Sequence, residues 1–312
     1  MVAVMSGAWI RAGQVLKDGV GRRCAIVTDS LSATLLAVGD GRTLSVSLNG
    51  GQAIRIGPLP RDGSRVEVPL FDNYSGPTRI ELIFDDVGAN DGLYISAGAG
   101  VSPVSNADKS TRRLIVLGNG YAEGVGASAP GVTSVAALIG ERLKVESINQ
   151  GWDGTDVDVR RGQQGNPVRN SGLDRVATDA VALAPDAILL IYGLDAALGS
   201  TAPTWQYAYD YATLLRTVRT ALPGVPIFCS GIPSCNTGIS EPFLRPWNDA
   251  IRDATITVDN CPYIDAAGWW GMANYYGGSG PVYVASDRLY PNDDGHEFLA
   301  DKYAIAMAQQ MQ

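Results

Sequence analysis

The sequence predicts two domains: a β-sandwich of the jelly-roll type over residues 1–108, then an α/β domain with a doubly wound, parallel, five-stranded sheet over residues 109–312. Three observations predict this. The chain has 312 residues, more than one core usually organises, and 46% of them are hydrophobic. Short alternating strands occupy the first hundred residues. From Arg113 onward, continuous apolar runs alternate with amphipathic stretches.

Apolar and polar residues alternate in several short segments near the N-terminus. Residues 44–48 show this period and run into Asn49-Gly50-Gly51, a hairpin turn signal. The same period recurs over 66–70 and 80–84. Strands this short, separated by turn residues, predict a small sandwich. A Gly-, Ser- and Pro-containing stretch over 98–111 is predicted to link the two domains.

The second part of the chain has the pattern of a parallel sheet. Leu114-Ile115-Val116-Leu117 is a continuous apolar run, typical of a strand that is buried on both faces. Further strands are expected over 145–148, 187–192, 225–228 and 263–264, and helices over 132–143, 174–183, 207–222, 246–253 and 296–311. Ligands of such sheets bind beyond the carboxyl ends of the strands, so we expect the chemistry in those loops.

Charge and hydropathy exclude several classes of partner. Lys and Arg number 24 against 32 Asp and Glu, which gives a net charge of −8. No basic stripe is present, so neither nucleic acid nor an anionic membrane is a predicted partner. No run reaches the roughly 18 apolar residues that cross a bilayer. The segment Met1–Arg11 lacks the pattern of a signal peptide.

The cysteines do not predict a metal site. The four of them show no CxxC spacing, and the chain has a single histidine. We expect buried thiols, with one or two disulfides as the alternative. The cysteines are Cys24, Cys229, Cys235 and Cys261. No cofactor is predicted.

Four segments at predicted strand ends carry recognisable motifs. They are Gly118–Gly124 after the first strand, Asn149–Thr155 after the second, Gly193–Ala196 after the third, and Asp287–His296 before the last helix. In order and spacing they resemble the SGNH (GDSL-type) hydrolases. That resemblance implies a flavodoxin-like sheet. A β-sandwich ahead of such a domain is similar to the layout of some carbohydrate esterases.

Matched residue by residue, the family's catalytic set is largely replaced. Its nucleophilic serine corresponds to Gly120, and its general base corresponds to Tyr290. The oxyanion-hole asparagine corresponds to Asp195. The resemblance leaves only the oxyanion glycine, as Gly154, and the aspartate of the last motif, as Asp287.

These replacements remove the chemistry of acyl transfer. A nucleophilic oxygen or sulfur is needed, and glycine has none. Imidazole, with a pKa near ~6.5, accepts a proton at neutral pH, whereas phenol, near ~10, does not. Losing one oxyanion donor costs about 3–4 kcal/mol of barrier. If Asp195 is ionised, it adds a repulsion of about 4 kcal/mol at roughly 4 Å. We therefore predict a hydrolase fold without hydrolase activity.

Other side chains are weak substitutes for the missing groups. His296 is the only imidazole, but family members often carry a histidine in this place that is not the base, so we expect a structural role. Ser128 and Thr155 have no evident partner base and are expected to cap helices or stabilise turns. The segment 28–32 mimics the first motif but lies in the β region without the later motifs.

Acidic residues offer a different chemistry. Glu123, Asp153, Asp195 and Asp287 follow strand ends and could approach one cleft. Paired carboxylates could hydrolyse a glycoside or hold a cation. The alternative is that Asp153 and Glu123 are solvated loop residues or helix caps.

Aromatic residues near the C-terminus are the candidates for ligand binding. One glycine-rich loop contains Trp269, Trp270, Tyr275 and Tyr276. Aromatic faces beside glycines suit stacking on sugars. Trp152 of the second motif could line the same cleft. The alternative is that these rings fill the core or the interface between the domains.

Together these observations predict a catalytically inactive protein with a structural or glycan-binding role. Its expected partners are a glycan or cell-surface polysaccharide, or other virion proteins, with a homo-oligomer as a further option. Related hydrolase domains occur on phage particles, so the resemblance and the acidic composition imply a virion surface, a phage tail or an extracellular location. The alternative function is an active esterase or deacetylase that acts on acylated carbohydrate.

Overall fold

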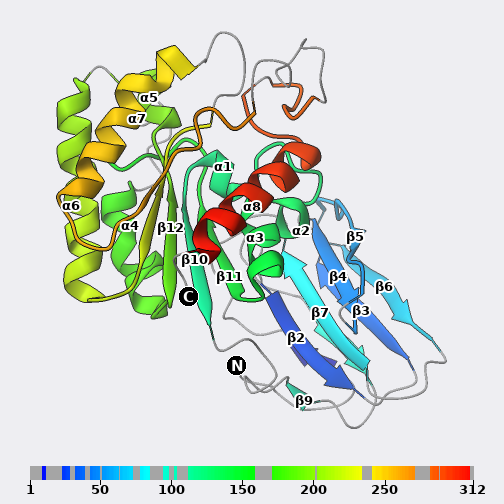
Figure 1. Cartoon of the computed structure of the whole chain (residues 1–312). Coiled ribbons are helices and arrows are strands. Elements are labelled where there is room, and N and C mark those ends of the chain that lie inside the picture. Colours follow the sequence, from blue (N-terminus) through cyan, green and yellow to red (C-terminus); the bar gives the residue numbers. More distant parts are fainter. Residues whose placement is uncertain are drawn as a thin grey trace. The chain divides into compact units, whose positions relative to one another are not determined.

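The computed structural model describes residues 9–11, 23–28, 32–38, 43–49, 51–62, 64–72, 78–84, 94–97, 102–103, 112–158, 171–200, 202–233, 241–270, 282–287 and 289–309. The chain divides into two compact units, Met1–Lys109 and Ser110–Gln312 (Figure 1). No helix within the described ranges is both long enough and apolar enough to cross a membrane.

The first unit consists of antiparallel strands in two sheets. One sheet has the order β1-β8-β3-β6, formed by Trp9–Arg11, Tyr94–Ala97, Ala33–Val38 and Arg65–Phe71. The other has the order β5-β4-β7-β2-β9, formed by Ile54–Ile56, Leu44–Leu48, Thr78–Phe84, Arg23–Thr28 and Ser102–Pro103. One hydrophobic cluster contains Leu35 of the first sheet with Leu44, Ile80 and Leu82 of the second. The alternating apolar residues of both sheets therefore share a core.

The predicted hairpin joins β4 and β5. Asn49 adopts a positive φ of 53°, and the Gly51 amide donates to the Leu48 carbonyl at 2.9 Å. The two strands pair with Leu44 opposite Ile56. Of the predicted linker 98–111, the structure describes Ser102–Pro103, which pairs with β2.

The second unit contains the predicted parallel sheet of five strands. The order is β11-β10-β12-β13-β14, in which the second strand along the chain lies at one edge and the first lies beside it. The strands are β10 Arg113–Gly118, β11 Glu146–Gly151, β12 Ala187–Ile191, β13 Ile227–Ser230 and β14 Tyr263–Ile264. All five residues of β12 are buried, as are five of the six residues of β10, which explains the unbroken apolar runs.

Helices cover both faces of this sheet. In Figure 1, α3 (Val135–Leu143) and α8 (Asp293–Ala308) lie together on one side, while α4 (Gly172–Asp179), α6 (Thr204–Ala221) and α7 (Glu241–Ile256) lie on the other. The short helices are α1 (Gly120–Glu123), α2 (Pro130–Thr133), α5 (Leu194–Gly199) and the 3₁₀ turn η3 (Val181–Leu183). This arrangement confirms the doubly wound α/β fold.

Several helix boundaries differ from the prediction. The stretch 132–143 forms two helices because Ser134 is extended, and its hydroxyl accepts a hydrogen bond from the Ala137 amide at 3.3 Å. The last helix begins at Asp293, since Asn292 caps it through the Gly295 amide at 2.9 Å. Helix α5 was not predicted, because six residues are too few to show a helical period.

Candidate active site

The carboxyl ends of three neighbouring strands carry the candidate residues. Strand β10 leads into α1, where the Asn119 side chain accepts a hydrogen bond from the Tyr121 amide at 3.1 Å. Strand β11 leads to Asp153, and β12 leads to Asp195. Because β11, β10 and β12 are adjacent and parallel, their carboxyl ends lie side by side.

Gly120, which occupies the nucleophile position, is enclosed by two side chains. A Cβ atom added to Gly120 would lie 2.6 Å from Oδ1 of Asp153 and 2.6 Å from both Cε1 and Cζ of Tyr290. Non-bonded carbon contacts favour separations of about 3.5–4.0 Å. Position 120 thus lacks a nucleophile, and no larger side chain fits there while Tyr290 keeps its place.

Tyr290 is fixed in this position by its hydroxyl and by its ring. The hydroxyl donates to Oδ1 of Asp153 at 2.5 Å, and the ring packs edge-on against Tyr121 with centroids 5.6 Å apart. Burial, together with the nearby carboxyl groups of Asp195 and Asp153, raises the pKa of Tyr290 far above its usual value. The phenol therefore stays protonated at neutral pH.

Asp287 supports the backbone that leads to Tyr290. Its Oδ1 accepts hydrogen bonds from the amides of Leu289 at 2.8 Å and Tyr290 at 3.1 Å. The phenol of Tyr290 turns to Asp153 instead. Asp287 is exposed, and its hydrogen bonds stabilise a turn. The family's motif has an imidazole base three residues after this aspartate, where this chain has Tyr290.

Asp195, at the position of the oxyanion asparagine, is deeply buried and 1% exposed. Neither of its carboxyl oxygens has a hydrogen-bond partner among the described residues. Burial, followed by the charges of Asp156 and Asp153, raises the pKa of Asp195 to about 8. The nearby Asn119 side chain opposes this shift to a smaller extent, although its contact with the carboxyl group does not have hydrogen-bond geometry. The repulsion considered for an ionised Asp195 therefore does not arise at neutral pH, because burial keeps the carboxyl group protonated.

Asp156 is equally buried but fully hydrogen-bonded. Its Oδ2 accepts from the amides of Gly193 at 3.2 Å and Ala196 at 2.8 Å, which fixes the start of α5. Its Oδ1 accepts from the Val157 amide at 2.7 Å and from the Tyr207 hydroxyl at 2.9 Å. Burial raises the pKa of Asp156, and these four hydrogen bonds oppose that shift.

Gly154 is the open position of the site. It has a positive φ of 71°, and no atom lies within 4 Å of an added Cβ. The next residue, Thr155, has the turn-stabilising role expected of it, because its hydroxyl donates to the Trp152 carbonyl at 2.7 Å.

His296 has both ring nitrogens engaged by the backbone. Nδ1 accepts from the Val135 amide at 3.2 Å, so the proton lies on Nε2, which faces the Val125 carbonyl at 3.1 Å. Burial lowers the pKa of His296 to about 4. Ser128 donates to Asp293 at 2.5 Å through its hydroxyl. His296 thus has the structural role expected of it, whereas Ser128 binds the first turn of α8 and has neither the helix-capping nor the turn role that was expected.

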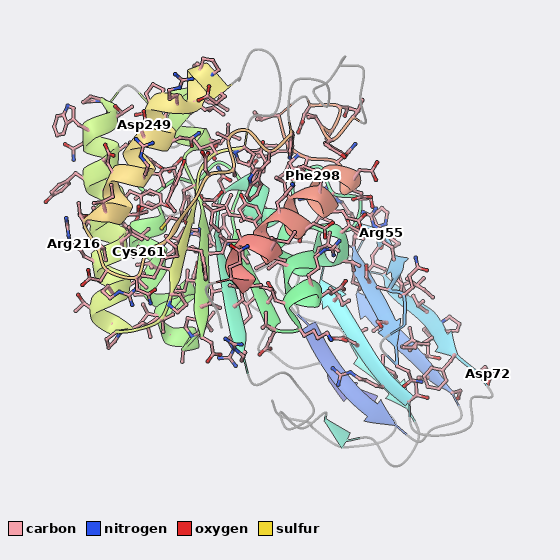
Figure 2. The ribbon with its side chains drawn as sticks, in the orientation of Figure 1. Arg55, Asp72, Arg216, Asp249, Cys261 and Phe298 are labelled. Carbon is pink, nitrogen blue, oxygen red and sulfur yellow. The ribbon has the colours of Figure 1, made fainter. Side chains whose placement is uncertain are left out.

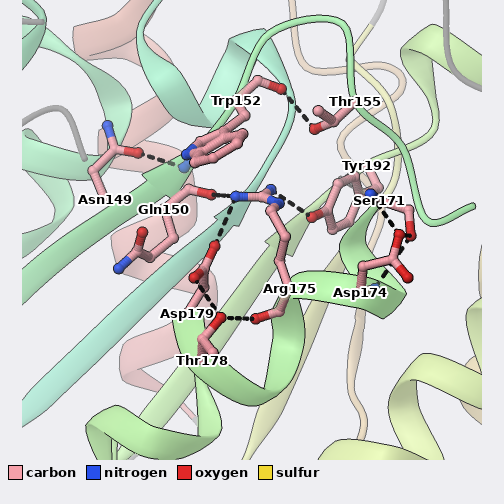
Figure 3. A network of polar contacts seen from close by, with 11 residues as sticks. Asn149, Gln150, Trp152, Thr155, Ser171, Asp174, Arg175, Thr178, Asp179 and Tyr192 are labelled. Atoms are coloured by element: carbon pink, nitrogen blue, oxygen red, sulfur yellow. Dashed lines mark hydrogen bonds and ion pairs between the residues drawn. The ribbon is translucent and has the colours of Figure 1, made fainter. Parts of the chain in front are cut away.

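Trp152 belongs to a buried polar network that the sequence does not reveal (Figure 3). The Arg175 guanidinium lies over its ring, 4.5 Å from the centroid. Arg175 also donates to the Gln150 carbonyl at 3.3 Å, to Asp179 at 2.9 Å and to the Tyr192 hydroxyl at 3.2 Å. One face of the Trp152 indole is therefore covered by a cation.

The two described aromatics of the C-terminal loop pack against the core. Trp270 is 2% exposed and meets Tyr283 edge-on, with centroids 6.3 Å apart. Trp269 is half-buried against Tyr303 at 4.9 Å. The other two predicted binding residues, Tyr275 and Tyr276, lie outside the described residues.

The acidic residues gather only in part. Glu123 accepts a hydrogen bond from the Asp153 amide, and the Asp153 carboxylate binds Tyr290. The charge of Asp153 contributes to the raised pKa of Asp195, whereas the Asp287 carboxylate accepts hydrogen bonds from backbone amides. Within the described ranges, no group of three or more His, Cys, Asp or Glu could hold a metal ion. Cys229 and Cys261 are free, buried thiols; the side chains of Cys24 and Cys235 lie outside the described residues.

Comparison with known proteins gives the family. The model of the GDSL-like lipase/acylhydrolase family matches residues 116–298, more than half of the chain. The chain belongs to this family. No curated protein matches its sequence.

Solved structures with this fold include carbohydrate esterases. A family two carbohydrate esterase from Cellvibrio japonicus has a TM-score of 0.73 at 15% identity, over 99% of this chain and 97% of that chain. The family two esterase from Clostridium thermocellum in complex with cellohexaose has a TM-score of 0.68 at 15% identity, over 95% and 94%. The acetyl xylan esterase Est2A from Butyrivibrio proteoclasticus has a TM-score of 0.69 at 13% identity, over 99% and 96%. At these identities the likeness shows the fold.

Two residues of this GDSL-like site escaped the sequence analysis. Asp156 and Arg175 stand outside the family motifs, and nothing in their local sequence marks them as buried. Their partners Tyr207 and Gln150 are 51 and 25 residues away in the chain, so only the fold reveals the contacts.

Proposed function

We propose that this GDSL-like protein binds glycan and does not hydrolyse acyl esters. The observation that carries the proposal is the enclosure of Gly120 by the Tyr290 ring and Asp153. A missing serine alone could reflect a displaced nucleophile. Here the space that a serine side chain would need is filled by a tyrosine held by a short hydrogen bond.

The other groups support loss of hydrolysis. The single imidazole donates to and accepts from the backbone, and its low pKa reflects a buried, neutral ring. Burial and the nearby carboxyl groups raise the pKa of the Tyr290 phenol, so it stays protonated at neutral pH. Acyl transfer requires a base that is hydrogen-bonded to the nucleophile. Gly120 offers no hydroxyl for such a pair, and the described serines that donate to a carboxylate, Ser128 to Asp293 and Ser171 to Asp174, do not occupy the family's nucleophile position.

The carbohydrate part of the proposal draws on fold likeness. Family two esterases share this architecture across nearly the whole chain, and the Clostridium thermocellum enzyme holds cellohexaose. We further infer that the two antiparallel sheets of the first unit form a jelly-roll-like β-sandwich, since one hydrophobic cluster draws on both. The virion or extracellular location, the virion partners and the homo-oligomer stay predictions.

Hydrolysis of p-nitrophenyl acetate separates this proposal from the alternative, an active esterase on acylated carbohydrate. We expect the purified protein to give no turnover above buffer, with the Cellvibrio japonicus esterase as positive control. Turnover that disappears in Asp287→Ala would overturn the proposal, because the surviving motif would then be catalytic.

Restoring the family's residues tests whether the geometry of the site remains. The triple variant Gly120→Ser, Tyr290→His and Asp195→Asn replaces the phenol beside position 120 by a smaller imidazole, and leaves Oδ1 of Asp153 as the other close contact of the added Cβ. We expect it to hydrolyse p-nitrophenyl acetate. The matched control, Gly120→Ser alone, is expected to be inactive and less stable. Equal activity of the two variants would contradict the role assigned to Tyr290.

Glycan binding is tested directly with immobilised neutral polysaccharides, including cellulose, xylan and mannan. We expect retention of the wild-type chain on at least one of them and elution by the matching oligosaccharide. Failure to bind any polysaccharide of this panel would refute the glycan-binding half of the proposal, whatever the esterase assay shows.

A further inference from the structure

Two aromatic side chains are exposed on α6. Trp205 is 68% exposed and Tyr209 is 61% exposed. They are four residues apart, so they lie on one face of the helix, about 6 Å apart along its axis. Within the described ranges, neither ring has an aromatic or cationic partner. We call Trp205 and Tyr209 the α6 aromatic pair.

The opposite face of α6 anchors the helix next to the candidate active site. Tyr207 and Tyr211 are fully buried, and Tyr207 packs edge-on against Trp247 with centroids 5.3 Å apart. The Tyr207 hydroxyl donates to Asp156, which fixes the start of α5. The α6 aromatic pair is therefore presented by a helix of 18 residues that is held in place by its buried face.

The aromatics nearer the family's active site are poorly placed for stacking. Trp270 is buried, Trp269 packs on Tyr303, and Trp152 carries a guanidinium on one face. Tyr290 fills the nucleophile position. Trp205 and Tyr209 are the most exposed aromatic side chains of the described residues, at 68% and 61% against 44% for Phe243.

The size of this surface indicates its occupant. A Trp or Tyr side chain buries about 150–250 Å² in full, so two rings exposed by about two-thirds offer about 200–330 Å². A stable protein dimer buries about 800 Å² on each partner. Two rings are therefore too small an area for a stable dimer, but they suit the flat faces of one or two sugar units.

The charge of the chain further limits which ligands can bind to the α6 aromatic pair. The chain carries a net charge of −8, so a second copy or an acidic glycan would be repelled. The next residues at the same spacing, Thr213 and Thr217, are uncharged, and their hydroxyls donate to carbonyls of the preceding turn at 2.9 Å each. Arg216, at the outer side of α6 in Figure 2, is the first exposed charge beyond the pair.

We propose that the α6 aromatic pair is a stacking platform for a neutral glycan chain. This inference rests on the proposed glycan-binding function and assigns it a surface outside the filled catalytic position. The rings would cover the apolar faces of successive sugars, while the sugar hydroxyls remain in water.

Labelling with fluorotryptophan tests this contact. The Trp205 resonance is identified by its loss in Trp205→Phe, and the wild-type protein is titrated with cellohexaose and with xylohexaose. We expect one of the two sugars to shift the Trp205 resonance. We expect Trp205→Ala and Tyr209→Ala each to weaken binding by about tenfold or more, and Tyr209→Phe, which keeps the ring, by about twofold at most.

Matched controls separate this surface from the rest of the chain. Ile256→Ala and Ile305→Ala remove side chains that are 77% and 62% exposed but carry no ring, and both should bind as the wild type does. Gly154→Asn fills the open position of the candidate active site, and Gly224→Asn makes the same change at another open glycine with positive φ. We expect neither asparagine variant to weaken binding.

The outcomes distinguish the two proposals. Wild-type binding that is lost in Gly154→Asn and kept in Trp205→Ala overturns the α6 platform and leaves the glycan-binding function intact. If the wild type binds neither of the two hexasaccharides and none of the polysaccharides of the panel, both proposals are overturned. Concentration-dependent dimerisation that Trp205→Ala abolishes would overturn the platform in favour of a second copy.

Discussion

The ends of β10 and β12 have departed from the family's chemistry in different ways. After β10, the nucleophile position is filled, because the Tyr290 ring lies against Gly120 and its hydroxyl binds Asp153 at 2.5 Å. After β12, Asp195 is just as buried, yet neither of its oxygens has a hydrogen-bond partner among the described residues.

The two strand ends thus differ in whether their buried polar side chains are hydrogen-bonded. At the β10 end, a tyrosine ring with a hydrogen-bonded hydroxyl lies where a side chain at position 120 would stand. The β12 end keeps a buried carboxyl group that folding must hold protonated. Asp156 is buried to the same extent as Asp195, but its carboxyl group accepts four hydrogen bonds.

The largest expected effect is at Asp156. Asp156→Ala leaves three amides and the Tyr207 hydroxyl without their acceptor, so we expect a loss of about 3–5 kcal/mol in the free energy of unfolding, measured in urea. Asp156→Asn, which keeps one oxygen, should lose less. The exposed Asp253→Ala is the control and should stay within about 0.5 kcal/mol of the wild type. A similarly small loss for Asp156→Ala would show that its hydrogen bonds contribute little.

Asp195 should make stability depend on pH. Its pKa is raised from an ordinary value of 3.8 to about 8 in the folded protein. Between these values the unfolded chain loses the proton first, so the free energy of unfolding of the wild type falls as pH rises and then levels off above the folded pKa. Asp195→Asn removes this titration. We expect the variant to be more stable than the wild type by about 2–4 kcal/mol at slightly alkaline pH.

The difference in the free energy of unfolding between Asp195→Asn and the wild type should shrink as the pH falls toward 3.8, the ordinary pKa of the aspartate in the unfolded chain. His296, with its pKa lowered to about 4, destabilises the fold in acid, but it does so in both proteins and cancels in the difference. Urea unfolding of both proteins across this range measures the difference. A constant difference would mean that Asp195 is already ionised in the folded state.

A smaller effect is expected at Gly120. Gly120→Ala places a methyl group against Tyr290 and Asp153 and should cost about 1–3 kcal/mol. In a Tyr290→Ser background the cost should fall, which gives a coupling of about 1 kcal/mol or more in a double-mutant cycle. Gly268→Ala, where no atom lies within 4 Å, is the control. Strict additivity would contradict the contact between positions 120 and 290.

Much of the fold was predictable because it depends on local periodicity. The apolar runs at 114–117 and 187–191 mark strands buried on both faces, and the turn at Asn49 marks a hairpin. That Gly120 stands at the family's serine position could be read from motif spacing alone, and the loss of hydrolysis inferred from it stays a prediction. The exposed pair Trp205 and Tyr209 was not, because rings at helical spacing look the same whether they face the core or solvent.

By itself the sequence determined the five-stranded sheet, the order of its motifs and the absence of serine and histidine from their family positions. Only the tertiary structure decided that Tyr290 fills the space beside Gly120, that burial raises the pKa of Asp195, and that Arg175 covers Trp152. The physical reason is distance along the chain. A residue's neighbours within one strand or helix follow from the sequence period. Burial, pKa and ring contacts depend instead on side chains that folding brings together, such as Asp153 and Tyr290, which are 137 residues apart.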